Sequence, residues 1–337
     1  MKREMFMKYT RTTVAAASAA ITILALTGCD AVSTGSPSGD ASGDCERSST
    51  KEIYFDYPLT SLSVYGDLQR FAEAAADERG YEVKYTADDN DLQKQNTNVQ
   101  ALVTQQVPAI VSYPLEPTSM ESLAAEARDN CTVFVSYAAP IENQDASILF
   151  SGLESGKALG QAALDWAAEQ DEPVKVLILQ DRDLAVGAER DDGLNEVFPG
   201  DAANIEIVAT QKASDREAGE QVTREVLQAN PDLNMVLSYN DDSGLGARQA
   251  FINAGVDPKD PSVFIGGQDG SKEGLEAVAE GGIYRTSVAV RIKDIGEAVA
   301  NVPIDILEGV ENDGVDVPPI ALTIDSDELA EYLSDYS

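Results

Sequence analysis

The sequence predicts an α/β fold built from two doubly wound parallel-sheet lobes that a hinge joins. From residue 52 onward, short apolar runs alternate with helical patterns, which is typical of parallel sheets covered by helices on both faces. About ten strands are expected, more than one twisted sheet usually holds. Residues 138–151 lack helical periodicity. We therefore expect two sheets with a boundary in that segment.

The individual elements follow from the spacing of apolar residues and from turn residues. A strand at 53–55 precedes a helix at 62–79, which ends at Gly80 because glycine commonly follows a helix C-terminus. The remaining strands are expected at 81–85, 109–112, 132–136, 174–179, 205–209, 235–238, 263–265 and 285–288. The remaining helices are expected at 91–105, 118–129, 155–169, 188–197, 217–229, 243–254 and 273–280.

Three further elements follow the second set of strands. They are a long helix at 292–308, an extended segment at 315–323 and a short closing helix at 326–336. These elements exceed what the second sheet needs, so the chain is expected to return to the first lobe.

Residues 1–28 are predicted to be a secretory signal. Basic residues precede a short apolar run at 14–26, too short to span a bilayer as a stable helix. The segment Leu26-Thr27-Gly28-Cys29 resembles the lipobox of bacterial lipoproteins, in which the cysteine is lipidated and becomes the first mature residue. That resemblance implies a lipid on Cys29 and a protein held on the extracytoplasmic face of the cell membrane. The alternative is an ordinary signal peptide with an incidental cysteine.

Residues 29–51 are expected to form a flexible tether between the lipid and the fold. The segment is rich in Ser, Gly, Asp and Thr and has no apolar periodicity. Such composition favours a flexible chain over a packed cap.

The strongly acidic composition argues against nucleic-acid partners. The chain has 24 Lys and Arg against 59 Asp and Glu, a formal charge of −35. Without residues 1–28 the balance is 20 against 58, or −38. This surface repels phosphate backbones and contains no basic patch. We interpret the charge as a solvated exterior.

Histidine is absent, which excludes His-based catalytic triads and His-containing metal sites. No metal or cofactor is expected, because neither Asp241-Asp242 nor residues 88–91 have the ligand spacing of an EF-hand loop. Of the three cysteines, Cys45 and Cys131 remain beside Cys29. An even pair in an oxidising compartment is consistent with a disulfide, and two free thiols are the alternative.

Polar and aromatic residues cluster where strands end. In doubly wound sheets, ligands bind at the carboxyl ends of the strands. Amides and carboxylates suit hydroxyl groups, and aromatic faces cover C–H surfaces. The pattern predicts a neutral, polyhydroxylated ligand. The segments concerned are 56–58, 113–114, 137, 180–182, 239–242 and 268–270.

Three segments of the chain resemble a known family. The segment 240–247, Asn-Asp-Asp-Ser-Gly-Leu-Gly-Ala, resembles the Asn-Asp-x-x-Ala-x-Gly-Ala segment of sugar-binding proteins. Residues 266–270 resemble their Gly-Phe-Asp-Gly turn, and residues 188–194 resemble their Arg-x-x-Gly-Phe segment. The family is the type I periplasmic sugar-binding proteins, similar to the ribose- and xylose-binding receptors of ABC importers. The resemblance covers roughly residues 52–325.

The resemblance implies two lobes that close on a ligand by a hinge motion. Residues 52–145 plus 290–315 would form the N-terminal lobe, and residues 150–288 plus 316–337 the C-terminal lobe. The protein would be a monomer that captures a sugar or polyol and delivers it to an ABC permease and its ATPase.

Seven candidate ligand-binding residues follow. Carried over by position, Arg190, Asn240 and Asp269 would hold sugar hydroxyls from the C-terminal lobe, and Tyr65 would stack on the ligand. The strand-end rule adds Asp56, Tyr113 and Tyr137.

The N-terminal lobe departs from the family pattern. Tyr137-Ala138 stands where ribose-type proteins have Asp-Arg, and Tyr113-Pro114 where they have Asn-Pro. Ala289 replaces a glutamine near the last hinge strand. A deoxy sugar, a polyol or a glycoside with an apolar face is the expected ligand.

Two other functions are alternatives to solute delivery. A sensory receptor would present the same closed form to a signalling protein. A carbohydrate-active enzyme would use an acid pair such as Asp241 with Asp242, or Asp181 with Asp183. The resemblance gives these acids binding or capping roles, so we expect no enzymatic activity and no catalytic residue.

Overall fold

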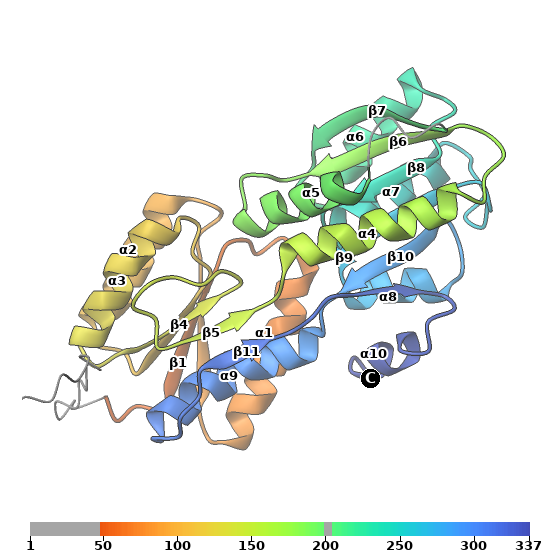
Figure 1. Cartoon of the computed structure of the whole chain (residues 1–337). Helices are drawn as coiled ribbons and strands as arrows, with labels where there is room; N and C mark the ends of the chain where they lie inside the picture. The colour runs from red at the N-terminus through yellow and green to blue at the C-terminus, as the bar shows by residue number, and fades with distance from the viewer. Residues whose placement is uncertain (1–47, 199–203) are drawn as a thin grey trace, which may run out of the picture. The chain divides into compact units, whose positions relative to one another are not determined.

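The computed structural model describes residues 48–198 and 204–337, whose strands form two six-stranded sheets (Figure 1). This confirms the predicted fold class. The signal peptide, Cys29, Cys45 and most of the expected tether lie outside the described residues.

The first sheet is entirely parallel, with strand order β11-β5-β4-β3-β1-β2. Together with its four helices it forms the first lobe. Its strands are β1 (Glu52–Tyr57), β2 (Glu82–Ala87), β3 (Ala109–Ser112), β4 (Val133–Tyr137), β5 (Ala146–Leu149) and β11 (Gly314–Asp316). Its helices are α1 (Ser63–Glu78), α2 (Leu92–Thr104), α3 (Pro117–Asp129) and α9 (Ile292–Leu307).

The second sheet has the order β12-β10-β9-β8-β6-β7, and only β12 pairs antiparallel. With its six helices it forms the second lobe. Its strands are β6 (Val174–Gln180), β7 (Ile205–Lys212), β8 (Met235–Ser238), β9 (Phe264–Asp269), β10 (Tyr284–Ala289) and β12 (Ile320–Thr323). Its helices are α4 (Gly152–Ala167), α5 (Ala185–Val197), α6 (Arg216–Ala229), α7 (Asp241–Asn253), α8 (Lys272–Ala279) and α10 (Leu329–Ser334).

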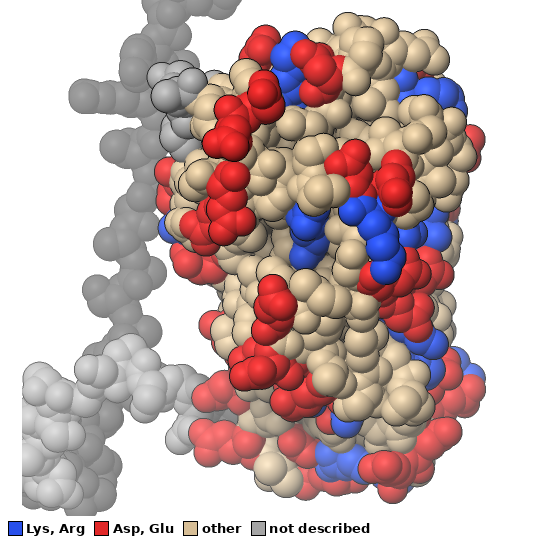
Figure 2. All heavy atoms as spheres, turned by 90° about the vertical axis from the view of Figure 1, so that its right-hand side faces the viewer, with Lys and Arg blue, Asp and Glu red and all other residues tan. Residues whose placement is uncertain are grey.

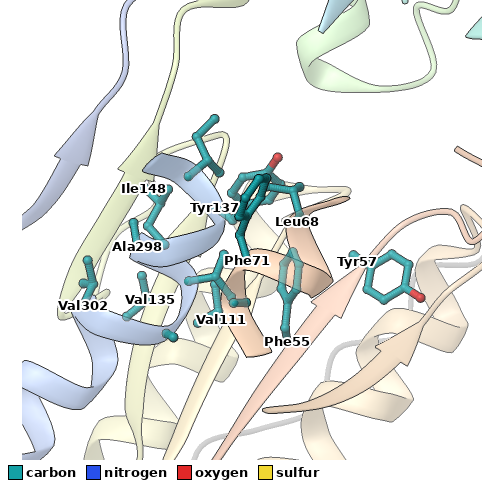
Figure 3. Packing of buried hydrophobic residues seen from close by; sticks show 14 of the residues in the cluster. Phe55, Tyr57, Leu68, Phe71, Val111, Val135, Tyr137, Ile148, Ala298 and Val302 are labelled. Atoms are coloured by element: carbon teal, nitrogen blue, oxygen red, sulfur yellow. The ribbon is translucent and has the colours of Figure 1, made fainter. Parts of the chain in front are cut away.

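Both faces of the first sheet are buried, because successive strand residues point to opposite sides. Val111 and Val135 pack under α1 and α9, where Leu68 and Val302 cover them (Figure 3). The alternate residues Ile110 and Phe134 pack under α2 and α3. The second sheet is covered likewise, with α4 and α5 on one face and α7 and α8 on the other. Burial on both faces explains the continuous apolar runs in the sequence.

Within the described residues the chain passes between the sheets three times: after β5, after β10 and between β11 and β12. Two local expectations change. Residues 138–151 contain the strand β5, and the extended segment 315–323 divides into β11 and β12, one in each sheet. Asp316, assigned by sequence to the C-terminal lobe, pairs with Leu149 in the first sheet.

Cys131, which lies just before β4, is disulfide-bonded. Its pairing with Cys45 stays a prediction, since Cys45 is not among the described residues. In the described part of the chain, no helix is both long and apolar enough to cross a membrane.

Glycines set the close approach of α4 and α5. A Cβ at Gly156 would lie 1.9 Å from the backbone oxygen of Arg190, and one at Gly193 would lie 2.0 Å from that of Leu153. Only glycine allows this spacing, because backbone atoms cannot yield as a flexible side chain can. The contact fixes the position of α5 and so of Arg190.

We predict that Gly156→Ala destabilises the protein by roughly 1–3 kcal/mol, the usual cost of overpacking. The matched control is Gly66→Ala in α1, where nothing lies within 4 Å of the added methyl group. That change should stabilise by roughly 0.5–1 kcal/mol, because alanine favours helix. Urea unfolding measures both. Equal stability of Gly156→Ala and the wild type would contradict the packing argument.

Candidate functional site

A narrow cleft with a volume of about 40 Å³ lies between the lobes at the carboxyl ends of both sheets. Six of the seven residues expected at the ligand line it, and Asp56 does not. The lining residues are Leu62, Val64, Tyr65, Tyr113, Tyr137, Phe150, Leu184, Val186, Arg190, Tyr239, Asn240, Asp269, Val290 and Ile292.

A buried ion pair forms the polar wall of the cleft. Arg190 on α5 is 3% exposed, and its Nη1 lies 2.7 Å from Oδ1 of Asp269 at the end of β9. The same nitrogen donates to the carbonyl oxygen of Tyr239 at 2.7 Å. The Nε–H of Arg190 is buried and has no hydrogen-bond partner among the described residues. A donor left unpaired at a cleft is costly unless a ligand accepts from it.

Asp269 is held in an unusual backbone conformation, with φ of 124°. Positive φ is costly for a non-glycine residue and persists where the surroundings impose it. Gly270 follows with φ of 75°, which permits the tight turn into α8. Burial raises the pKa of the Asp269 carboxyl, and the charge of Arg190 opposes that rise.

Behind this wall, Asp241 anchors the start of α7. Its carboxyl accepts from the backbone N–H of Ser271 (2.8 Å) and from the hydroxyls of Ser271 (2.9 Å), Tyr284 (2.7 Å) and Ser287 (2.7 Å). Burial and the nearby charge of Asp269 raise its pKa to about 7, although these four donors favour the ionised form. Asp241 therefore acts as a structural support beneath the cleft.

Asn240 lines the cleft and also caps α7. Its Oδ1 accepts from the backbone N–H of Ser243 at 2.8 Å and from the Ser243 hydroxyl at 2.6 Å, while Nδ2 donates to the Ser214 carbonyl at 3.2 Å. An N-cap amide satisfies donors at the helix start. Since these bonds use the oxygen, the side chain has only its second N–H to offer a ligand.

Tyrosines form the wall that comes from the first lobe. Tyr65 on α1 stacks on Tyr57, with ring centroids 4.9 Å apart. The ring centroid of Tyr137 lies 6.0 Å from that of Tyr113 and 6.0 Å from that of Phe150. Burial raises the pKa of Tyr113 to about 12 and raises those of Tyr65 and Tyr137 as well. These hydroxyls therefore stay protonated and can both donate and accept.

Asp56 lies beneath the first-lobe wall, outside the cleft. It is fully buried and accepts from Thr86 Oγ1 at 2.7 Å, Ser112 Oγ at 3.0 Å and Gln95 Nε2 at 3.2 Å. The strand predicted at 53–55 was shorter than the observed strand. β1 continues to Tyr57, so the side chain of Asp56 points toward α2 while those of its neighbours point toward α1.

Several lining residues were not among the seven candidates. Phe150 follows β5, a strand that the sequence analysis did not predict, and Val290 follows β10. Had β5 been recognised, the strand-end rule would have located Phe150. Tyr239 was noted after its strand, and its hydroxyl donates to the Ser214 carbonyl at 2.9 Å.

Direct contacts join the two lobes at the cleft. Asp242 at the start of α7 accepts from the N–H (2.8 Å) and the hydroxyl (2.9 Å) of Ser63 at the start of α1. The backbone N–H of Val186 donates to the hydroxyl of Tyr113 at 3.3 Å. The charge of Asp242 also suits the positive end of the α1 helix dipole.

We predict that Asp269→Asn costs roughly 3–5 kcal/mol of stability, because it leaves Arg190 buried without its counter-charge. Asp183→Asn is the matched control, since Asp183 pairs with Lys212 at an exposed position. Removing that exposed pair should cost less than about 1 kcal/mol. Urea unfolding at pH 7 compares the two. Similar small losses in both variants would show that the Arg190–Asp269 pair is not structurally important.

A family model described as the periplasmic binding protein domain matches residues 53–311. The ribose import binding protein of Bacillus subtilis is 27% identical over 263 residues, covering 77% of this chain and 83% of that protein. The xylitol-binding protein of Mycolicibacterium smegmatis is 26% identical over 312 residues, covering 87% and 86%.

Solved structures have the same fold. A Caulobacter myo-inositol binding protein bound to myo-inositol superposes with a TM-score of 0.74 at 20% identity, covering 86% of this chain and 98% of that one. An ABC transporter solute binding protein from Mycobacterium smegmatis with bound glycerol gives a TM-score of 0.70 at 26% identity, covering 82% and 94%. The family match spans most of the chain, and both lobes have the expected architecture. The chain therefore belongs to the periplasmic binding protein family.

Proposed function

We propose that this protein captures a sugar or sugar-like polyol between its lobes and delivers it to an ABC transporter. The observation that carries the proposal is the cleft itself, which combines the Arg190–Asp269 pair with buried, protonated tyrosines. Uncharged hydroxyl groups can form hydrogen bonds both with the ion pair and with the tyrosine hydroxyls. The relatives named for ribose and xylitol point to the same ligand class.

Binding requires the lobes to separate. The cleft volume of about 40 Å³ is far below the roughly 300–1,000 Å³ of typical small-molecule pockets. Widening would break the contacts of Ser63 with Asp242 and of Tyr113 with Val186. A ligand that compensates for this loss would shift the population back toward the closed form. We propose that the transporter recognises that form.

The ligand should have one polar edge and one apolar face. The charged groups that line the cleft, Arg190 and Asp269, both belong to the second lobe. The first lobe contributes Leu62 and Val64 beside its tyrosines, Val290 lies on the crossing between lobes, and Ile292 begins α9. A wall of this kind stacks on C–H surfaces and accepts few hydroxyls. Deoxy sugars, polyols and glycosides with an apolar face fit this arrangement.

Catalysis is not supported by the positions of the acid pairs. Asp241 is engaged by four donors, and Asp242 binds Ser63 across the lobes. Asp181 accepts from Ser214, and Asp183 pairs with Lys212 at the surface. Glycosidases instead need two carboxyls facing the same bond. A sensory role uses the same closed form and stays an alternative, which neighbouring genes for a permease and ATPase would argue against.

We also propose that the protein is held at the membrane by a lipid on Cys29. The support is the sequence Leu26-Thr27-Gly28-Cys29 after an apolar run. The exterior of the described chain suits an aqueous compartment, since acidic side chains are spread over the face shown in Figure 2 and basic ones are fewer.

We predict that a neutral sugar or polyol raises the melting temperature in a screen of pentoses, hexoses, deoxy sugars and polyols. A ligand at 100 times its Kd stabilises by about 2.7 kcal/mol. Arg190→Ala should abolish the shift, while Arg224→Ala, at an exposed position on α6, should retain it. A response to amino acids or nucleosides alone would overturn the proposed ligand class.

We predict that Cys29→Ser moves the protein from the membrane fraction to the soluble extracytoplasmic fraction of a bacterial host. An alkyne-tagged fatty acid should label the wild type and leave the variant unlabelled. Cys131→Ser serves as the control, because it removes a disulfide-bonded cysteine outside the signal and should keep both the label and the fraction. Membrane association of an unlabelled wild type would contradict lipidation.

A further inference from the structure

Two carboxylic acids are buried together beneath the first-lobe wall of the cleft. Asp56 near the end of β1 and Asp88 just after β2 both have 0% exposed surface. The two carboxyls lie on either side of one donor, since Gln95 Nε2 is 3.2 Å from Asp56 Oδ2 and 3.0 Å from Asp88 Oδ2. Neither acid forms a salt bridge with any residue in the described ranges, whereas buried charges are normally paired.

The groups around the pair come from three elements. Thr86 on β2 and Ser112 on β3 donate hydroxyls to Asp56, and Asn98 on α2 donates to Asp88 Oδ1 at 2.7 Å. The charged neighbour is Lys94 on α2, which lowers the pKa of Asp88 but itself pairs with exposed Asp89. β3 contributes only a hydroxyl. Burial, followed by the charge of Asp88, raises the pKa of Asp56 to about 8.

Gln95 links this acid pair to the cleft. Its Nε2 lies 3.2 Å from Asp56 Oδ2, 3.0 Å from Asp88 Oδ2 and 2.6 Å from the carbonyl oxygen of Tyr113. Its Oε1 accepts from the backbone N–H of Leu115 at 3.0 Å. Because the acids accept from Nε2, the amide has only one possible orientation. In that orientation Nε2 donates to the Tyr113 carbonyl and Oε1 accepts from the Leu115 N–H.

Residues 113–115 in turn carry part of the cleft wall. Tyr113 is 2% exposed and lines the cleft, and its hydroxyl accepts from the backbone N–H of Val186 in the second lobe. The Tyr113 N–H donates to the backbone oxygen of Asp56 at 3.1 Å. A change in the acid pair therefore reaches the cleft through two hydrogen bonds, from the Leu115 N–H to Gln95 and from the Tyr113 N–H to Asp56.

We propose that Asp56 and Asp88 share one proton and that the protonated pair, acting through Gln95, positions residues 113–115 at the cleft, so that alkaline pH loosens this wall. Loss of the proton leaves two adjacent buried carboxylates, which repel each other and favour water entry. The folded state holds a proton that the unfolded chain releases near pH 4. The stabilisation is therefore greatest below pH 4 and is lost as pH rises toward about 8.

Hydrogen exchange of the Leu115 and Tyr113 amides tests the proposal without a ligand. In the wild type, their protection factors, corrected for the intrinsic pH dependence of exchange, should fall at least fivefold between pH 6.5 and pH 9. Asp56→Asn supplies a permanent N–H donor toward Asp88 and should keep protection constant over this range. Asp89→Asn removes the same charge at the exposed neighbour and should reproduce the wild-type fall.

A flat wild-type profile would overturn the proposal, as would an equal fall in Asp56→Asn. If Asp56→Asn does not fold, carbon-13 NMR of the wild-type aspartate carboxyls decides instead. One proton should leave the pair between pH 7 and pH 9, and titration of both acids below pH 5 would overturn the shared proton. Failure here is separate from failure of sugar binding, because neither measurement includes a ligand.

Discussion

The cleft depends on a buried arginine whose charge must be balanced where two helices and two strand ends meet. Arg190 is placed by the glycine contact between α4 and α5, and it is held by Asp269 and the Tyr239 carbonyl. An unpaired buried charge is costly, so β9, β8 and α5 are constrained together by this one side chain. The positive φ of Asp269 is consistent with that constraint. The polar wall of the cleft is therefore rigid before any ligand arrives.

The two walls have different chemistry although both come from the same kind of sheet. The second lobe presents an ion pair and a capping amide, whereas the first presents tyrosines and aliphatic side chains. Two buried acids of the first lobe, Asp56 and Asp88, lie beneath its wall and both accept from Gln95. This division suits a neutral ligand whose two sides differ in polarity. It also makes Tyr113 a point where support from below and contact across the cleft meet.

Much of this organisation could be predicted from the sequence. The alternation of apolar runs and helical patterns gave both sheets, and the strand-end rule placed Tyr113 and Tyr137 at the cleft, because parallel strands end at a common edge. Resemblance to sugar-binding proteins added Arg190 and Asp269. Asp56 does not line the cleft, because the apolar pattern predicted that its strand ends at residue 55 and β1 continues to Tyr57. A residue expected in an exposed loop is therefore a buried strand residue.

Other features could not be predicted because they depend on packing across distant segments. β5 is a strand of four residues, and its short pattern in Ala146–Leu149 does not stand out from a loop. The engagement of the Asn240 oxygen within its own helix start, and the pairing of Asp56 with Asp88, require coordinates. The same holds for the contact of Asp242 with Ser63, which joins helices from different lobes.

The central claim is that the tyrosine wall and the Arg190–Asp269 pair contact one ligand between the lobes. Its most direct measurement is a titration with carbon-13-labelled tyrosine, following ring resonances by NMR as a binding sugar or polyol is added. The account predicts saturable shifts at Tyr65, Tyr113, Tyr137 and Tyr239, with Tyr54 and Tyr332 unchanged. Saturable binding with shifts confined to Tyr54, Tyr332 or other tyrosines outside the cleft would contradict it.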